Sequence, residues 1–235
     1  MKNENNSLIE IKDLRKLYLR KDSAPVKALD AVNLEVFKGE FLVIFGRSGS
    51  GKTTLLNLIG ALDRPTSGEI KFEGKTLSNF SNRDLATLRR EEIGFIFQTF
   101  NLLSSLTVVE NIESALIHSR MSKEQRQVKL AALLDFLDLS EMSNRFPLEL
   151  SVGQQQKVAI ARALIKDPAL ILADEPIGDM DPITGREILE KLIELNRTSN
   201  ITLIVASHRT FMHPEINRTL FINAGKIVSQ NDAGY

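Results

Sequence analysis

Residues 46–53 bring together residue types that could hold a phosphate group. They match the pattern G-x-x-x-x-G-K-[ST] with the run Gly46-Arg47-Ser48-Gly49-Ser50-Gly51-Lys52-Thr53. Glycines permit positive φ and a close approach of the backbone, so successive amides can point at one anion. The N-terminus of a following helix adds partial positive charge. In this pattern Lys52 would reach the β- and γ-phosphates of a nucleotide, and the Thr53 hydroxyl would bind Mg²⁺.

Two adjacent acids supply the second part of such a site. Asp174 and Glu175 follow the apolar run ALILA at 169–173, which is typical of a buried strand. Mg²⁺ prefers oxygen ligands and keeps several waters, so Asp174 is a candidate to hold the ion or one of its waters. Glu175 is placed to orient and deprotonate an attacking water. The alternative is a solvated acidic turn after a strand.

The stretch LELSVGQQQKVAIARAL at 148–164 allows two interpretations. It is either an ordinary helix start or a second element that binds phosphate. Val158, Ala161 and Ile165 recur at helical spacing, so one face of the helix should pack inward. The first amides of that helix, with Ser151 and Gly153, would form a second anion site.

Hydrophobic patterns predict the elements that position these residues. FLVIF at 41–45 ends at Gly46 and predicts a strand buried on both faces, and residues 52–62 predict a helix that ends before Pro65. Further strands are expected at 8–11, 28–37, 93–97, 169–173, 201–206, 220–222 and 227–229, a hairpin arm at 68–74, and a helix at 184–196.

The middle of the chain has a different pattern. Residues 107–165 are mostly helical in pattern and poor in glycine, and Ser122 to Gln125 form a capping-box start for a helix through Leu137. The order is therefore sheet, helical insert, sheet. Parallel strands joined by helices predict an α/β fold that binds ligands at the carboxyl ends of its strands.

Composition narrows the class of protein. Lys plus Arg and Asp plus Glu both number 30, so the zero net charge gives no argument for nucleic acid as a partner. The absence of Cys excludes disulfides and thiolate metal sites. The first ten residues lack the apolar segment of a secretory signal. The apolar runs are far shorter than the roughly 20 residues of a membrane span. We expect a soluble chain with no membrane span of its own.

The motifs together resemble those of the ABC-transporter ATPases, and the resemblance covers nearly the whole chain. No N-K-x-D motif, with which a GTPase reads guanine, is present. The run 150–154, LSVGQ, resembles the family's LSGGQ signature. Gln98 after IGFIF resembles the Q-loop glutamine, and His208 after ITLIVAS resembles the switch histidine. The run 178–181, GDMD, resembles the D-loop, and Tyr18 resembles the aromatic residue on which adenine stacks.

This resemblance implies a fold and a division of the chain. The fold would be a P-loop NTPase core with a mixed, largely parallel sheet, flanking helices, an antiparallel β arm and an inserted helical subdomain. Residues 1–235 would form a single domain, with the ATP-binding core at about 1–98 and 166–235. The helical subdomain would take about 99–165.

The resemblance also implies roles for individual residues. Lys52, Glu175 and His208 would be catalytic, with His208 holding the γ-phosphate. Thr53, Gln98 and Asp174 would hold Mg²⁺. The residues expected to contact ATP are Tyr18, Gly46, Arg47, Ser48, Gly49, Ser50, Gly51, Lys52, Thr53, Thr54, Gln98, Ser151, Gly153, Gln154 and Asp181.

The implied activity is ATP hydrolysis coupled to motion. Two Mg²⁺-ATP molecules would lie in a head-to-tail homodimer, each between one subunit's P-loop and the other's signature. The dimer would drive an integral membrane permease, so the chain would be cytoplasmic and peripheral on the inner face of the cell membrane. FIFQTFNLLSSLTVVENI and ALDRPTSGEI are similar to lipoprotein-release, macrolide-export and cell-division ATPases. The cell-division branch keeps an alternative open, an ATP-gated regulatory module with little or no transport.

Three positions depart from the family pattern. Val152 stands where the signature has Gly, residues 176–181 read PIGDMD where PTGNLD is usual, and Arg209 stands where an acid is common. Val is β-branched and avoids positive φ, so a left-handed backbone at 152 would impair the signature and a helical one would tolerate it. These departures bear on turnover more than on ATP binding. Gln155 and Gln156 are expected to face solvent.

Overall fold

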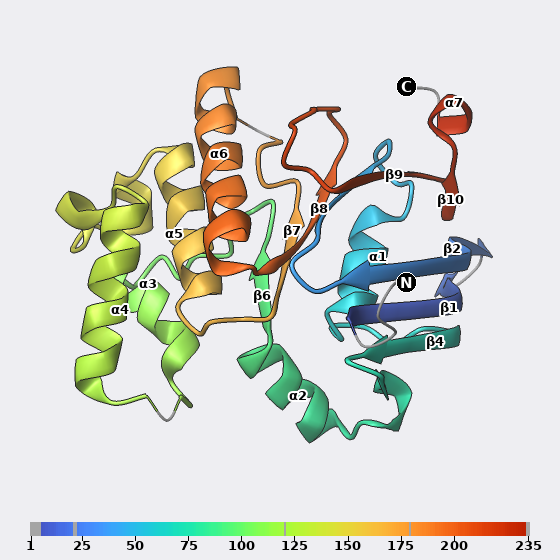
Figure 1. The fold of residues 1–235 in the computed structure, drawn as a ribbon, viewed down its shortest axis with the longest axis horizontal. Coiled ribbons are helices and arrows are strands. Elements are labelled where there is room, and N and C mark those ends of the chain that lie inside the picture. Colours follow the sequence, from blue (N-terminus) through green and yellow to red (C-terminus); the bar gives the residue numbers. More distant parts are fainter. Residues whose placement is uncertain (1–5, 21–22, 120, 179, 234–235) are drawn as a thin grey trace.

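The computed structural model describes residues 6–20, 23–119, 121–178 and 180–233, which form two sheets and the helices around them (Figure 1). The larger sheet has six strands in the order β10-β9-β3-β8-β7-β6. Its strands are β3 (Phe41–Phe45), β6 (Ile93–Ile96), β7 (Leu170–Asp174), β8 (Thr202–Ser207), β9 (Arg218–Asn223) and β10 (Lys226–Val228). All neighbours pair in parallel except β9 and β10.

The smaller sheet is the antiparallel arm, in the order β2-β1-β4-β5. It contains β1 (Ser7–Arg20), β2 (Ser23–Phe37), β4 (Ser67–Phe72) and β5 (Lys75–Thr76). β1 is much longer than the strand predicted at 8–11. Its register shifts between Ile11 and Leu14, next to Asp13 at φ 47°, and this irregularity breaks the alternation from which the strand was predicted.

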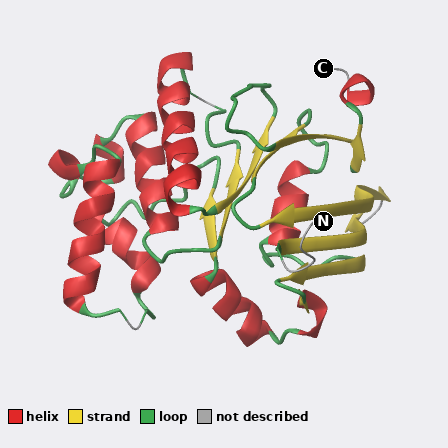
Figure 2. Ribbon diagram, viewed as in Figure 1, coloured by secondary structure: helices red, strands yellow, loops and turns green. Residues whose placement is uncertain are grey.

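Helices join and cover these strands (Figure 2). The α-helices are α1 (Lys52–Ile59), α2 (Asn82–Glu91), α3 (Val108–Glu113), α4 (Lys123–Phe136), α5 (Val152–Leu164), α6 (Pro182–Ser199) and α7 (Gln230–Ala233). Short 3₁₀ segments are η1 (Leu77–Asn79), η2 (Ser114–Leu116), η3 (Ser140–Met142) and η4 (Pro147–Glu149). The capping box predicted at Ser122 and Gln125 is present. The helix predicted at 184–196 begins earlier, because Asp181 caps it and Pro182 stands at its first position.

β3 lies between two hydrophobic clusters. Phe41, Val43 and Phe45 belong to the cluster shared with α3, α4, α5 and α6, whereas Leu42 and Ile44 belong to the cluster shared with α1, α2 and the arm. Figure 1 shows the corresponding layers, with α3–α6 on one side of the larger sheet and α1 with the smaller sheet on the other. The P-loop NTPase fold expected from the sequence is confirmed.

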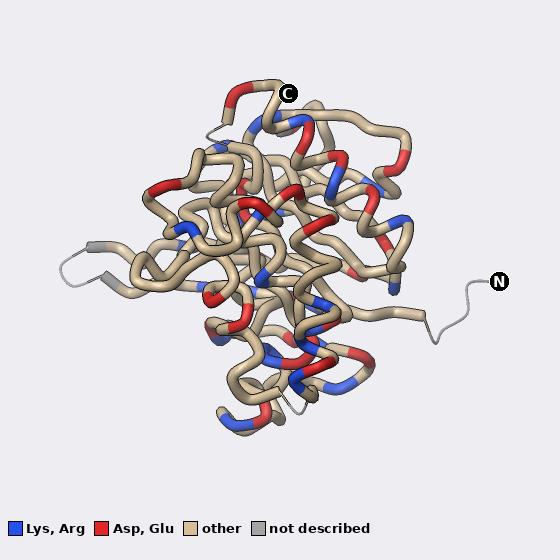
Figure 3. The backbone as a smooth tube through the Cα atoms, turned by 90° about the vertical axis from the view of Figure 1, so that its left-hand side faces the viewer, with Lys and Arg blue, Asp and Glu red and all other residues tan. Residues whose placement is uncertain are grey.

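Between β6 and β7 the described residues of the segment 99–165 contain helical elements and loops and no strand. The division into core and helical subdomain stays a prediction. A close contact joins the two predicted parts. A Cβ added at Gly94 of β6 would lie 2.9 Å from the carbonyl oxygen of Ala163 in α5, so α5 packs directly on the larger sheet. No helix in the described ranges is long and apolar enough to cross a membrane. Figure 3 shows acidic and basic positions interspersed along the chain.

Candidate active site

The loop between β3 and α1 has a backbone that depends on glycine. Gly49 and Gly51 have φ of 76° and 113°. A Cβ added at Gly46 would lie 2.4 Å from Ser50 Oγ, and one added at Gly51 would lie 2.5 Å from the Ala28 carbonyl oxygen. Ser50 Oγ is buried and has no hydrogen-bond partner. A buried, unpaired hydroxyl inside a glycine loop at a helix start fits a loop that binds an anion. Arg47 and Ser48 are exposed on this loop.

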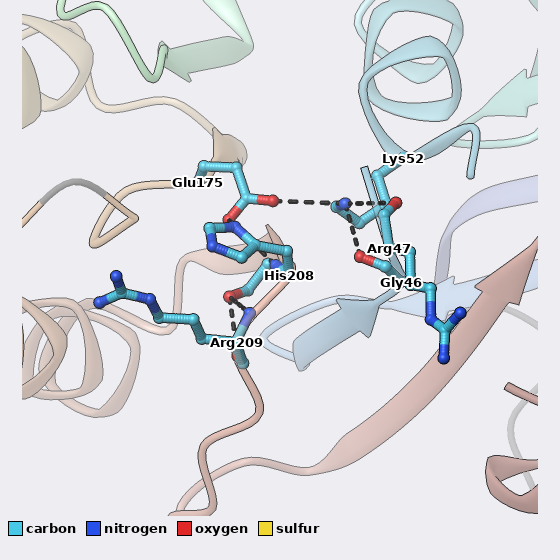
Figure 4. A network of polar contacts seen from close by, with 7 residues as sticks. Gly46, Arg47, Lys52, Glu175, His208 and Arg209 are labelled. Carbon is cyan, nitrogen blue, oxygen red and sulfur yellow. Dashed lines mark hydrogen bonds and ion pairs between the residues drawn. The ribbon is translucent and has the colours of Figure 1, made fainter. Parts of the chain in front are cut away.

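Lys52 is buried at the first position of α1 and connects this loop to Glu175. Its Nζ donates to the carbonyl oxygens of Gly46 at 2.8 Å and Arg47 at 3.3 Å. The same Nζ lies 3.3 Å from Glu175 Oε1. Figure 4 shows Lys52 reaching toward Glu175 while the guanidinium groups of Arg47 and Arg209 point away from the pair.

Glu175 follows β7 with φ at 50°, in the left-handed region that costs a non-glycine residue roughly 1–2 kcal/mol. Its carboxylate is 9% exposed. Oε2 accepts a hydrogen bond from the backbone amide of His208 at 3.0 Å and contacts His208 Nδ1 at 2.8 Å. The strained backbone therefore coincides with a carboxylate fixed between a lysine and a histidine, as expected where strain serves a site.

Ser207 and Arg209 shape the turn that carries His208. The Ser207 hydroxyl donates to the Arg209 carbonyl at 2.8 Å and accepts from the Arg209 amide at 3.1 Å. The Arg209 departure therefore leaves the backbone of this turn closed by hydrogen bonds, and its side chain plays no part in the Glu175–His208 contact.

Asp174 has the features of a cation ligand. Its Oδ1 is buried without a hydrogen-bond partner. Burial raises the pKa of its carboxyl, opposed by a hydrogen bond with Thr53 and raised further by the charge of Glu175. An orphaned carboxylate oxygen beside a threonine hydroxyl fits a hard cation. Gln98 is exposed just after β6, Asp174 ends β7, and these two strands pair in parallel, so both residues lie at the carboxyl ends of neighbouring strands.

Tyr18 lies on β1 near the start of α1. Its hydroxyl donates to Asp63 Oδ2 at 2.9 Å, and Lys16 Nζ lies 4.9 Å from the centre of its ring. Burial raises the pKa of Tyr18, as does the hydrogen bond to Asp63, while a hydrogen bond with Thr54 lowers it. Tyr18 is 38% exposed. Stacking of adenine on this ring stays a prediction.

The start of α5 explains which signature position needs glycine. Ser151 is the N-cap, and a capping box joins it to Gln154, with Ser151 Oγ accepting from the Gln154 amide at 3.3 Å. Val152 is the first helical residue and is 46% exposed. A Cβ added at Gly153 would lie only 2.5 Å from Thr184 Cγ2 of α6. Glycine is therefore required at 153 by close packing, and Val is tolerated at 152 because its backbone is helical.

The capping box also leaves two donors. It uses the amides of Ser151 and Gln154, and the amides of Val152 and Gly153 have no acceptor inside the helix. Gln155 is half-buried and donates to the Leu150 carbonyl at 3.2 Å. Gln156 was expected to face solvent, and that prediction is wrong: its side chain is 1% exposed, and both of its amide atoms lack partners. α5 is covered by α3, α6 and β6, so its buried face is wider than its apolar residues indicate.

Apart from Tyr18 on β1, the predicted site residues form two groups. The loop 46–53, Asp174, Glu175 and His208 meet at the carboxyl ends of parallel strands, with Gln98 on the same edge. Ser151, Gly153 and Gln154 belong to the start of α5, beside the start of α6, where Asp181 accepts from the amides of Ile183 and Thr184. Figure 1 shows α5 and α6 side by side with their starts at the same end. Asp179 of the predicted D-loop lies outside the described residues.

Sequence reasoning missed three residues at these sites. Thr184 forces glycine at 153, Asp63 holds Tyr18, and Arg162 binds the loop after Gln98 through the carbonyls of Phe100 and Asn101. Thr184 and Asp63 act across long sequence separations and leave no local signal. Arg162 is a charged residue within the mostly buried helix α5, which was a signal that could have been used.

Comparison with known proteins identifies the family to which this chain belongs. The sequence model of a family described as ABC transporter matches residues 29–178. The chain belongs to the ABC transporter family. The match includes the loop 46–53, the signature and Asp174–Glu175, while Tyr18, Asp181 and His208 lie outside it.

Relatives of this ABC transporter chain fall into two kinds. An uncharacterized ABC transporter ATP-binding protein of Thermotoga maritima is 43% identical over 94% of the chain and 93% of its own length. The macrolide export ATP-binding/permease protein MacB of Hyphomonas neptunium is 44% identical over 95% of the chain but only 34% of its own length. The chain thus spans about a third of that relative.

Solved structures have the same fold. A dimeric ATP-binding cassette in a post-hydrolysis state, bound to ADP and Pi, has a TM-score of 0.85 and 38% identity, over 93% of this chain and 96% of that one. The cassette cbiO1 of Clostridium perfringens, part of the transporter complex cbiONQ, has a TM-score of 0.84 and 26% identity, over 95% of this chain and 88% of that one.

Proposed function

We propose that this chain is the ATP-binding and ATP-hydrolysing subunit of an ABC transporter complex. The observation that carries the proposal is the contact of Lys52 with Glu175 beside a glycine loop, with His208 on the same carboxylate. A phosphate-binding cation and a candidate base are thereby fixed at one end of a parallel sheet. The dimeric relative bound to ADP and Pi supports the same reaction.

ATP would bind with its phosphates on the amides of the loop 46–53, and Lys52 would exchange the Glu175 carboxylate for phosphate oxygens. Thr53, Asp174 and Gln98 would hold Mg²⁺, which when bound neutralises phosphate charge. Glu175 then accepts a proton from water while the water oxygen bonds to the γ-phosphorus. The bond from that phosphorus to the β–γ bridging oxygen breaks, and ADP keeps the electron pair. His208 orients Glu175 and faces the γ-phosphate.

The second group of residues acts in a dimer. The unpaired amides of Val152 and Gly153 form an anion site at the start of α5. This second site is built from other elements than the glycine loop at 46–53. A head-to-tail dimer brings the start of α5 in one copy to the γ-phosphate held by the other. The dimeric relative supports a dimer of this chain. Asp181, at the neighbouring helix start, lies where it can communicate across that interface.

A membrane permease receives the motion. MacB relatives are named as ATP-binding/permease proteins, and a pyoverdine export relative has the same kind of name. A cleft of about 990 Å³ between α2, the segment after α3, and α4 offers a dock; its lining includes Thr87, Arg90, His118, Gln125, Lys129 and Lys166. Gln98 is not among its lining residues. Through the permease, the chain would be peripheral on the inner face of the membrane, in an export or lipoprotein-release role.

Replacement of the candidate base tests the proposal. Glu175→Gln lowers ATP turnover by roughly 10²–10⁴, the range of general-base catalysis, and traps an ATP-bound dimer that size-exclusion chromatography detects. Glu194→Gln, a change at a half-buried carboxylate on α6, is the matched control and leaves turnover unaltered. Turnover at the wild-type rate in Glu175→Gln would remove Glu175 from its role. ATP-driven dimerisation that gates a membrane partner without moving cargo would favour the regulatory alternative.

A further inference from the structure

The helix that begins at the signature also holds the loop that follows Gln98. Arg162 of α5 donates from Nη1 to the Asn101 carbonyl and from Nη2 to the Phe100 carbonyl, both at 2.6 Å. These two carbonyls belong to consecutive residues just after Gln98. The planar guanidinium suits such a paired contact, because its donors form a rigid fork.

The loop that Arg162 holds has an unusual backbone. Phe100 and Asn101 have φ of 58° and 49°, in the left-handed region that residues other than glycine seldom adopt. Local hydrogen bonds close the turn, from the Phe100 amide to the Phe97 carbonyl and from Thr99 Oγ1 to Asn101 Oδ1. Burial lowers the pKa of the Arg162 guanidinium, so the two carbonyls replace water around a poorly hydrated charge. Two left-handed residues and a half-buried cation thus define one loop geometry.

Two further contacts, both just after Arg162 in the chain, fix this end of α5 to the core. Next to Arg162, the Ala163 carbonyl lies so close to Gly94 of β6 that an added Cβ would be 2.9 Å away. One turn later, Lys166 Nζ donates to the Arg89 carbonyl at 2.6 Å, at the end of α2. α5 cannot slide over β6 at this end. Its 13 residues make a rod of about 20 Å whose other end is the signature.

We propose that Arg162 is a positioning residue that couples the loop after Gln98 to the signature at the start of α5. A change of that loop, when Gln98 meets the metal and phosphate, shifts the guanidinium and turns α5 about this fixed end. The start of α5, with Ser151 and Gly153, is thereby placed for the second subunit. The inference rests on the proposed function, and it assigns the coupling to one side chain.

The charge of Arg162 and the paired donors of its guanidinium can be removed separately. Arg162→Gln keeps a neutral donor and removes the charge, and Arg162→Lys keeps the charge but replaces the fork by a point donor. Lys157→Gln, on the same helix and paired with the exposed Asp138, is the control. Each is measured for ATP affinity of the dilute monomer, kcat, KM and thermal midpoint. ATP-induced dimerisation is measured in the Glu175→Gln background.

If Arg162 couples the two elements, its replacement should change kcat and dimerisation but not the ATP affinity of the monomer. Arg162→Gln should leave monomer affinity for ATP near the wild-type value, and lower kcat and ATP-induced dimerisation by about 10- to 100-fold, as a displaced group would. Arg162→Lys should recover part of that loss, and Lys157→Gln should show none. If Arg162→Gln does not fold, Arg162→Lys shows the same split in smaller size.

Two results would overturn the inference. One is a fall in monomer affinity in step with the thermal midpoint, which marks a merely structural residue. The other is unchanged kcat and dimerisation in both Arg162 variants. A wild-type chain that neither hydrolyses ATP nor dimerises would instead refute the proposed function, so the two failures are distinguishable.

Discussion

The Nζ of Lys52 lies 3.3 Å from Oε1 of Glu175, so the residue proposed to bind phosphate and the residue proposed to activate water are each other's counter-ion. Both side chains are buried, and His208 holds the other carboxylate oxygen. Phosphate must therefore compete with Glu175 for Lys52. The same step that binds ATP releases Glu175 oxygen Oε1 for water.

This relationship predicts that Glu175→Gln binds ATP more tightly as a monomer, apart from any effect on turnover. The amide removes the negative charge that competes for Lys52, and we expect affinity to rise about three- to tenfold, up to roughly 1.4 kcal/mol. Titration with a fluorescent ATP analogue below the dimerisation concentration measures it. Glu194→Gln, which keeps the Lys52–Glu175 pair, should bind with wild-type affinity. Weaker binding by Glu175→Gln would show that the pair helps to hold ATP.

Close packing between α5 and α6 predicts a paired effect at Gly153 and Thr184. Gly153→Ala places a methyl group 2.5 Å from Thr184 Cγ2, and overpacking of this kind costs about 1–3 kcal/mol. The displaced helix start should reduce ATP-induced dimerisation. Thr184→Ser removes the clashing methyl and should restore both stability and dimerisation to Gly153→Ala. Denaturant unfolding and size-exclusion chromatography follow the two effects, and a double variant no better than the single one would contradict the packing argument.

Val152→Gly is the matched change at the neighbouring position. Val152 is exposed at the first helical position, so replacing it with glycine removes little packing. We expect monomer affinity and hydrolysis to stay within about twofold of wild type, with at most a small loss of helix stability from glycine. A marked rise in hydrolysis would mean that Val152 slows turnover after all.

The buried carboxylate of Asp174 predicts a stability that depends on pH and on Mg²⁺-ATP. Burial raises its pKa above the ordinary value, so the folded state binds the proton more tightly than the unfolded state. As pH rises through the raised pKa, folding loses stability, and the loss persists at neutral pH. Asp174→Asn should therefore melt higher than wild type at pH 7 in EDTA, by about 2–4 °C per kcal/mol relieved.

That advantage should vanish below the ordinary carboxyl pKa, where both forms are neutral. It should reverse when Mg²⁺-ATP is added, because wild type gains the ligand's stabilisation. Asp135→Asn, an exposed change on α4, is the control and should show neither effect. A lower midpoint for Asp174→Asn at pH 7 without nucleotide would contradict the assignment of burial as the cause.

Local sequence patterns predicted the fold and the residues proposed for the centre of the site. FLVIF, the glycine loop and the helix after it lie within one short stretch, so their order alone specifies strand, loop and helix. Asp174 and Glu175 were placed by the strand before them. The extent of β1 was not predictable, because Asp13 adopts a left-handed backbone inside a strand that tertiary pairing maintains.

Other features depend on contacts between distant residues. The need for glycine at 153 comes from Thr184, and the burial of Gln156 comes from three elements that surround α5. By contrast, the start of α6 had local signals in Asp181 and Pro182, a cap and a proline at the first position, which the strand-and-helix pattern alone did not use.

β3 alternates its side chains between the two hydrophobic clusters, and this has a consequence for cooperativity. Phe41, Val43 and Phe45 stabilise one layer and Leu42 and Ile44 the other, so neither layer can lose its packing while β3 stays in place. The arm and the helical side should therefore melt in a single transition. A ligand on the loop that ends β3 should slow amide hydrogen exchange in both layers at once.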